Sequence, residues 1–171
     1  DTKALVYTAA AKRLYSCSVA DAKAAVVTSD TVARIGSFSV SPDSKWVAYA
    51  SNETGRSEVY VRRVEGDAGK IAITANGGRQ PVWSSDGRRI YYTNGRTLMQ
   101  ANLSSGPSLS VVSRDSLFSG NFSPGDGMAA PYDVTRDGSH FVMLESADDA
   151  QQVVVVTNWP AELRAKLGKK P

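Results

Sequence analysis

The chain repeats one short pattern four times, and a repeat at a nearly fixed period constrains the fold more than any single motif does. In each copy an Asp opens the pattern, an apolar residue follows four positions later, and a large side chain follows six positions later. The aligned Asp residues are Asp1, Asp43, Asp86 and Asp137, at intervals of 42, 43 and 51 residues. The fourth-position residues are Leu5, Val47, Ile90 and Phe141, and the sixth-position residues are Tyr7, Tyr49, Tyr92 and Met143. The pattern predicts a repeat architecture.

Short segments within each unit alternate apolar and polar residues between turn residues, which is the pattern of β-strands. We predict strands at 36–40, 46–51, 58–64 and 70–74 in the second unit, and at 81–83, 89–93, 97–103 and 109–112 in the third. The fourth unit predicts strands at 132–134, 140–145 and 151–157, and the first unit at 4–8, 13–19 and 24–28. Four short strands per unit of about 40 to 45 residues, with no helix between them, predict β-propeller blades.

The predicted fold class is therefore all-β, a β-propeller of about four consecutive four-stranded blades with the first and last incomplete. A β-sandwich is the alternative, but a sandwich does not require the same turn and offsets to recur four times. The blades are expected at about 1–30, 31–75, 76–117 and 128–157, followed by a short C-terminal helix and basic tail at 158–171.

The helix prediction rests on Asn158 as a cap and on Pro160 in the first turn. Trp159, Leu163 and Leu167 recur every four residues and form one apolar stripe. The stripe either packs across the propeller or docks a partner.

Each unit from the second onward carries an Asp in the tight turn after its first strand. The residues expected to form these turns are Asp43, Asp86, Gly87, Asp137 and Gly138. Asp and Gly suit such turns because they tolerate positive φ and hydrogen-bond the local backbone. One Asp per blade does not converge on one ion, so we predict no metal site.

Composition narrows the classes of function. The chain is 42% hydrophobic and 22% charged, as in soluble globular proteins, and no apolar run approaches the length of a membrane span. The net charge is +3 with scattered Lys and Arg, so we expect no nucleic-acid interface. The single cysteine, Cys17, lies in a strand-like alternation and is interpreted as a structural thiol rather than a reactive one.

Catalytic motifs are missing from the sequence. The only histidine, His140, follows an Asp-Gly turn, and there is no Gly-x-Ser-x-Gly elbow and no Cys/His zinc spacing. Ser123–Gly127 is glycine-rich but has neither the Lys nor the following helix of a phosphate loop. We therefore predict no catalytic residue and no cofactor.

The residues now described resemble the TolB-type (WD40-like) β-propeller repeat. The resemblance lies in Ser41–Tyr49 with Glu58–Val61, and in Gly77–Gly87 with its Trp-Ser-Ser-Asp-Gly ending. Residues 153–163 look like the C-terminal end of propellers attached to bacterial serine/threonine kinases. Such repeats also occur in tricorn-like and prolyl-oligopeptidase-like proteases and in a periplasmic protein of the Tol–Pal system.

The resemblance implies a recognition scaffold that binds a protein, peptide or small ligand as the sensor part of a larger bacterial signalling protein. The alternative is an accessory propeller that gates substrate entry in a serine protease. The resemblance favours a periplasmic or extracytoplasmic location and leaves a cytoplasmic one open.

The third interval exceeds the others by about eight residues, and the excess falls between Ser113 and Pro131, with Phe118, Phe122 and Met128. This stretch is either a tolerated insertion or a binding loop. Ligands are expected on the face where the connections between blades lie. The candidate ligand-binding residues are Arg34, Arg79, Gln80, Phe122, Tyr132 and Asp133.

The first unit lacks its innermost strand and the fourth its outermost, so we expect the chain not to close a ring alone. The remaining blades would come from another segment or chain. Until they are in place, the faces around Leu5, Tyr7, Phe141 and Met143 would meet water.

Overall fold

The structure is a computed structural model, and its strands confirm the all-β prediction. It describes residues 4–9, 13–18, 23–28, 33–66, 69–104, 108–123, 129–146 and 151–156. Within these ranges there are fourteen strands and no helix. The helix and basic tail predicted at 158–171 lie outside the described residues.

The strands form four antiparallel sheets, one for each sequence repeat, which we number blades 1 to 4. Blade 1 holds β1 (Ala4–Ala9), β2 (Arg13–Ser18) and β3 (Ala24–Thr28). Blade 2 holds β4 (Ile35–Val40), β5 (Trp46–Ser51), β6 (Glu58–Arg63) and β7 (Ile71–Ala72). Blade 3 holds β8 (Arg79–Trp83), β9 (Arg89–Asn94), β10 (Thr97–Leu103) and β11 (Val111–Ser119). Blade 4 holds β12 (Tyr132–Val134), β13 (Phe141–Ser146) and β14 (Gln151–Val156).

The outer strand of blade 3 is longer than the sequence pattern predicted. Strand β11 has nine residues and pairs with β10 as far as Ser119, whereas a strand at 109–112 was expected. Leu117 and Phe118 are buried near its end, in the core shared with blade 4. The first part of the stretch from Ser113 to Pro131 is therefore strand and not loop, because these two apolar side chains pack on the neighbouring blade.

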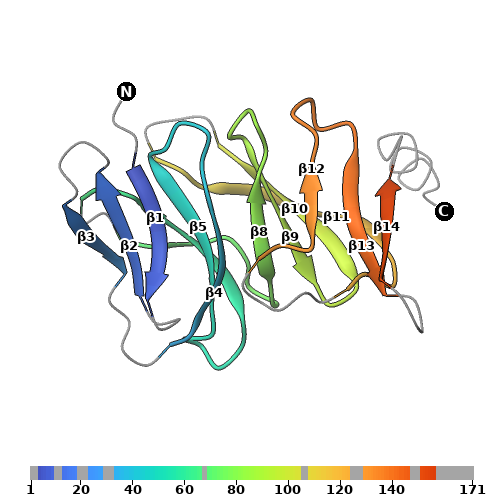
Figure 1. Cartoon of the computed structure of the whole chain (residues 1–171), viewed down its shortest axis with the longest axis horizontal. Helices are drawn as coiled ribbons and strands as arrows, with labels where there is room; N and C mark the ends of the chain where they lie inside the picture. Colours follow the sequence, from blue (N-terminus) through green and yellow to red (C-terminus); the bar gives the residue numbers. More distant parts are fainter. Residues whose placement is uncertain are drawn as a thin grey trace.

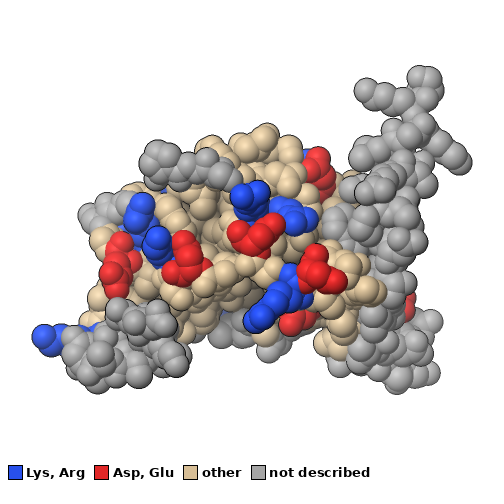
Figure 2. All heavy atoms as spheres, turned by 90° about the horizontal axis from the view of Figure 1, so that it is seen from above, with Lys and Arg blue, Asp and Glu red and all other residues tan. Residues whose placement is uncertain are grey.

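The four sheets follow one another along the long axis of the molecule, with β3 near one end and β14 near the other (Figure 1). The turns at 41–44, 84–87 and 135–138 project from one face, at the top of Figure 1, which we call the turn face. The connection from β7 to β8 and the described ends of the connection from β11 to β12 (120–123 and 129–131) lie on the opposite face, which we call the connection face. Figure 2 looks onto the turn face and shows acidic and basic side chains beside one another across it.

In the part of the chain that the structure describes, the core consists of three clusters, each between two consecutive blades. Along β9, Ile90 and Tyr92 face blade 2 while Tyr91 between them faces blade 4. The Tyr91 ring meets Phe141 edge to face, with centroids 4.9 Å apart. Because strand side chains alternate between faces, every inner blade contributes to two clusters. Full burial of one such side chain stabilises the fold by roughly 1.5–3 kcal/mol.

The same alternation decides what the two end blades expose. Phe141 and Met143 are 0% and 1% exposed, so the expectation that they meet water is wrong: they face blade 3. Val142 points the other way and is 38% exposed. On blade 1, Val6 faces blade 2, while Tyr7 is 37% exposed and stacks on Tyr15 with centroids 5.3 Å apart. The side chain of Leu5 lies outside the described part of the chain. The molecule is a partial propeller.

Candidate functional site: a groove on the connection face

The three turns of the turn face share one hydrogen-bond pattern. In blade 3, Ser84 Oγ donates to Asp86 Oδ1 over 2.6 Å and accepts from the Arg89 N–H over 2.9 Å. Asp86 Oδ1 also accepts from the Arg88 N–H over 3.0 Å. The other two turns repeat these contacts with Ser41, Asp43, Lys45 and Trp46, and with Thr135, Asp137, Ser139 and His140. Each carboxylate thus bonds within its own turn.

These bonds favour the ionised carboxylates. Partial burial raises the pKa of Asp86, but hydrogen bonds from Ser84, Arg88 and Arg89 outweigh burial and bring the pKa to about 2. The Thr135 hydroxyl and the Ser139 N–H bring the pKa of Asp137 to about 2 as well. Burial opposes the change at Asp43, whose pKa is nevertheless lowered by hydrogen bonds from Ser41 and Lys45.

A groove on the connection face brings together three of the six candidate ligand residues. Arg79, Gln80 and Phe122 line a groove of about 350 Å³ between blades 2 and 3 and the connection that leads to blade 4. The remaining lining residues are Arg56, Ser57, Asn76, Gly77, Gly78, Thr93, Asn94, Gly95 and Ser123.

The other three candidates lie elsewhere. Arg34 lies immediately before β4, and its N–H donates to Asn52 Oδ1 over 2.7 Å. Tyr132 is 6% exposed, and burial raises its pKa well above the ordinary value. Asp133 is exposed outside the lining, and its Oδ1 accepts from the N–H of Val134 over 2.8 Å.

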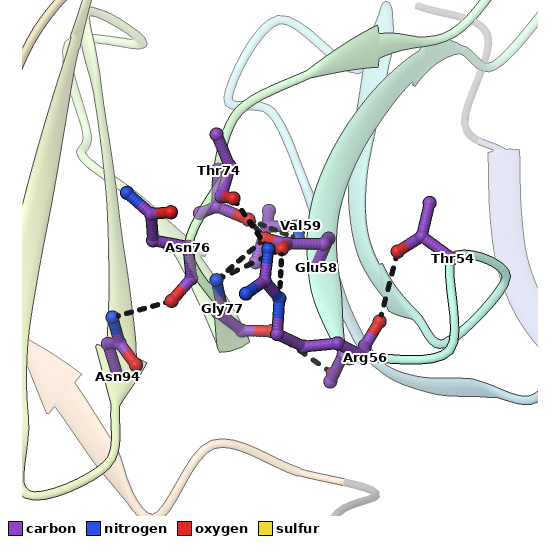
Figure 3. A network of polar contacts seen from close by, with 11 residues as sticks. Thr54, Arg56, Glu58, Val59, Thr74, Asn76, Gly77 and Asn94 are labelled. Atoms are coloured by element: carbon purple, nitrogen blue, oxygen red, sulfur yellow. Dashed lines mark hydrogen bonds and ion pairs between the residues drawn. The ribbon is translucent and has the colours of Figure 1, made fainter.

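One side of the groove is held by a buried carboxylate, Glu58, at the start of β6 (Figure 3). Glu58 is 4% exposed and pairs with Arg56 Nε at 2.7 Å. Its carboxylate also accepts from the Thr74 hydroxyl and from the Gly77 N–H, the latter at 3.0 Å from each oxygen. Arg56 Nη2 donates to the Ala75 carbonyl oxygen over 2.7 Å. The β7–β8 connection is thereby tied to the β5–β6 loop.

The sequence analysis did not predict Glu58 as a residue of the site. The signal available was an acid at the first position of an otherwise apolar strand, two residues after an Arg. Such an acid is costly to bury unless it is paired, which points to a local partner.

Two glycines let the connection pass close to its neighbours. Gly77 has a φ of 97°, where most other residues are strained. A Cβ on Gly78 would lie 2.7 Å from Thr74 Cγ2. The Gly-Gly pair is therefore needed for the Glu58 contacts to form.

Gln80 gives this side of the groove its shape. The residue is 3% exposed and has a φ of 55°, at an irregularity in the β8–β9 pairing between Arg79 and Val82. Such a conformation costs a non-glycine residue about 1–3 kcal/mol and persists only where surrounding contacts hold it. Here the Tyr132 hydroxyl donates to the Gln80 carbonyl oxygen over 2.7 Å, and the Thr93 hydroxyl donates to Gln80 Oε1 over 2.8 Å.

The turn face carries a groove too, of about 370 Å³, between the turns of blades 2 and 3. Trp46, Trp83 and Leu109 are among its apolar lining residues, and Asp43 and Asp86 also line it. His140 lies apart from this groove, with its Nδ1 2.5 Å from Ser139 Oγ.

Among the described residues, no three His, Cys, Asp or Glu side chains come together as a metal-binding group. No helix in the described part of the chain has the length and apolarity needed to cross a membrane.

Comparison with solved structures shows what fold these blades belong to. TolB from Acinetobacter baumannii matches with a TM-score of 0.65 and 18% identity over 90% of this chain and 37% of that chain. A putative TolB from Agrobacterium tumefaciens matches with a TM-score of 0.64 and 16% identity over 91% of this chain and 57% of that chain. A chain from a study of two prolyl endopeptidases matches with a TM-score of 0.50 and 20% identity over 91% of this chain and 26% of that chain.

Neither protein-family models nor curated protein sequences match the chain. The chain spans between about a quarter and three fifths of the solved proteins just named. At these identities the likeness shows the fold: the chain is a β-propeller segment like that of TolB.

Proposed function

We propose that this chain is a non-catalytic recognition segment of a β-propeller and that it binds a protein or peptide ligand in the groove on the connection face. The observation that carries the proposal is the tie between Glu58 and the β7–β8 connection. The tie consists of an ion pair between the buried Glu58 carboxylate and the exposed Arg56 side chain, and of the Gly77 N–H, which is shared between the two Glu58 oxygens. A preformed site loses less conformational entropy on binding.

The size and position of the groove support the proposal. Its volume of about 350 Å³ lies within the range of ligand sites, roughly 300–1,000 Å³. It is built from loops on a rigid sheet scaffold, where binding residues concentrate. A short peptide stretch fits such a groove better than a large flat partner does.

For the whole protein, we propose the sensor part of a larger bacterial signalling protein, with the propeller outside the cytoplasm. The resemblance of residues 153–163 to the end of kinase-linked propellers supports this. The alternative, a propeller that gates substrate entry in a serine protease, is supported by the likeness to the prolyl endopeptidase chain. The complete gene separates the two, because one requires a kinase domain and the other a hydrolase domain.

We further propose that additional blades, from another segment or another chain, cover the outer faces of blades 1 and 4. Tyr7 and Val142 occupy positions whose counterparts in the inner blades are buried between sheets. Sedimentation of the purified protein over a concentration series tests this. Self-association is expected, and a monomer that stays stable at high concentration with no added partner would count against it.

Selection from a displayed random peptide library tests the binding function. Purified protein is expected to enrich peptides, and Asn76→Trp is expected to abolish the binding because the indole fills the groove. Asn76 contributes only its backbone carbonyl to the Asn94 contact, so the substitution removes no side-chain partner there. The matched control, Arg88→Trp at the turn-face groove, should bind as the wild type does.

If no peptide is enriched, or if only Arg88→Trp weakens binding, the proposed site is wrong. The non-catalytic part has its own test. Peptidase or esterase turnover by the purified protein, abolished by one substitution at His140 or Ser84, would overturn it.

A further inference from the structure

The groove on the connection face has charged lining residues of one sign only. Among the described residues that line it, Arg56 and Arg79 are the charged ones, and neither Asp nor Glu is present. The groove on the turn face differs, since Asp43 and Asp86 line it together with Arg88. The two grooves should therefore prefer ligands of different charge.

The two arginines of the connection-face groove are not equivalent. Arg56 is compensated, because it pairs with Glu58 at 2.7 Å and donates to the Ala75 carbonyl oxygen. Arg79 is exposed, and within the described part of the chain its guanidinium makes no ion pair and no hydrogen bond. Arg79 thus supplies the uncompensated positive charge of this groove.

The backbone around Arg79 is held in an unusual conformation. An irregularity in the β8–β9 pairing begins at Arg79, and Gln80 follows with a φ of 55°. Bonds from Tyr132 and Thr93 hold Gln80 in place. Irregularities of this kind redirect side chains and are frequent beside binding sites. The conformation of Gln80 is therefore held next to Arg79, which lines the groove.

An apolar contact lies in the same groove. Phe122 is partly buried, and its ring meets Phe118 edge to face at 5.7 Å. Asn76 and Asn94 are exposed in the lining and add polar groups that can contact a peptide backbone.

We propose, on the basis of the proposed function, that this groove selects acidic peptide segments. Arg79 binds an Asp or Glu carboxylate of the ligand, and Phe122 contacts a neighbouring apolar side chain. The guanidinium suits this role because it donates two parallel hydrogen bonds to a carboxylate. Basic segments are rejected because no acid in the lining receives them.

An array of paired 12-residue peptides tests this inference. Each Asp- or Glu-containing peptide is printed beside a twin with Asn or Gln in the same positions, and the purified protein is applied at low and at high salt. Wild-type protein is expected to bind the acidic twin roughly five- to tenfold more tightly, because a hydrogen bond to a charged group contributes more than a neutral one. The preference should shrink at high salt.

Substitutions test whether Arg79 causes the preference for acidic peptides. Arg79→Ala should abolish it, Arg79→Lys should retain part of it, and Arg79→Glu should reverse it in favour of basic peptides. The control Arg88→Ala removes an exposed arginine of the turn face and should leave it unchanged. Circular dichroism spectra of the variants verify that each is folded.

The outcomes separate this inference from the proposed function. Equal binding of both twins, still blocked by Asn76→Trp, would overturn the acidic preference and leave peptide recognition standing. Absence of binding to every peptide would overturn both. A preference that survives Arg79→Ala and is lost in Arg88→Ala would move the acidic site to the turn face and refute the inference.

Discussion

The phenol hydroxyl of Tyr132 on β12 donates a 2.7 Å hydrogen bond to the backbone carbonyl oxygen of Gln80 on β8. The bond joins the innermost strands of blades 3 and 4. It also holds Gln80 in its left-handed conformation, beside Arg79. One hydroxyl therefore couples the packing of two blades to the shape of the groove.

Tyr132→Phe is expected to lower the free energy of unfolding by about 1–2 kcal/mol. It removes one buried hydrogen bond and leaves the Gln80 carbonyl oxygen without the donor that Tyr132 supplies. Urea denaturation measures the change. Tyr91→Phe is the matched control, since the Tyr91 hydroxyl is buried without a hydrogen-bond partner among the described residues. That variant should be as stable as the wild type or more so, and equal losses in both variants would contradict the assignment.

Ser44→Gly is expected to stabilise the protein by about 1 kcal/mol. Ser44 has a φ of 60° at the turn position where the other two blades carry Gly87 and Gly138, at 66° and 71°. Relief of the left-handed strain exceeds the entropy that glycine adds to the unfolded chain. Thermal unfolding reports the gain. The reciprocal change, Gly87→Ser, should destabilise by a similar amount, and a loss of stability in Ser44→Gly would argue against strain at this turn.

Glu58→Gln is expected to cost about 2 kcal/mol of stability. The amide keeps the size of the side chain but loses the charge that pairs with Arg56 and turns one acceptor oxygen into a donor facing the Gly77 N–H. Denaturant unfolding measures the loss, and Glu65→Gln serves as the exposed control, expected within about 0.5 kcal/mol of the wild type. Hydrogen exchange at Gly77 should also rise, and unchanged exchange there would mean that Glu58 does not hold the connection.

Lowering the pH toward 2 should reduce the contribution of the Asp86 turn in blade 3 to the free energy of unfolding. The folded pKa of Asp86 is about 2, below its ordinary value of 3.8, so the contribution of Asp86 to stability is fully present above pH 3.8 and is lost as the pH falls toward 2. Because its side chain is 42% exposed, we expect about 1 kcal/mol. Asp86→Asn should be less stable than the wild type at pH 7, and the two should converge near pH 2. Urea midpoints between pH 2 and 7 test this, and parallel curves would contradict it.

The sequence was sufficient for the local features. The Asp-centred turns and the alternation of apolar residues predicted the sheets, and the innermost strand of blade 4 lies at 132–134 as expected. These features depend on neighbouring residues: Asp86 bonds to groups two or three positions away, and β-strand alternation has a period of two.

Only the tertiary structure decided the rest. The repeat could not tell which face of each strand meets the next blade, so Phe141 and Met143 were expected at water where Val142 lies instead. It likewise did not reveal that β11 continues to Ser119, because the packing of Leu117 and Phe118 on blade 4 extends it.

The groove, too, was predicted only in part from the sequence. Arg79, Gln80 and Phe122 were candidates from their place beside inner strands, but Glu58 was missed and Tyr132 proved to be a buried anchor. Glu58 meets Gly77 across 19 positions, and Tyr132 meets Gln80 across 52. The sequence by itself determined strands, turns and repeat, because those depend on short-range backbone preferences. The tertiary structure decided the groove, because its contacts join residues far apart in the chain, where no local pattern records the partner.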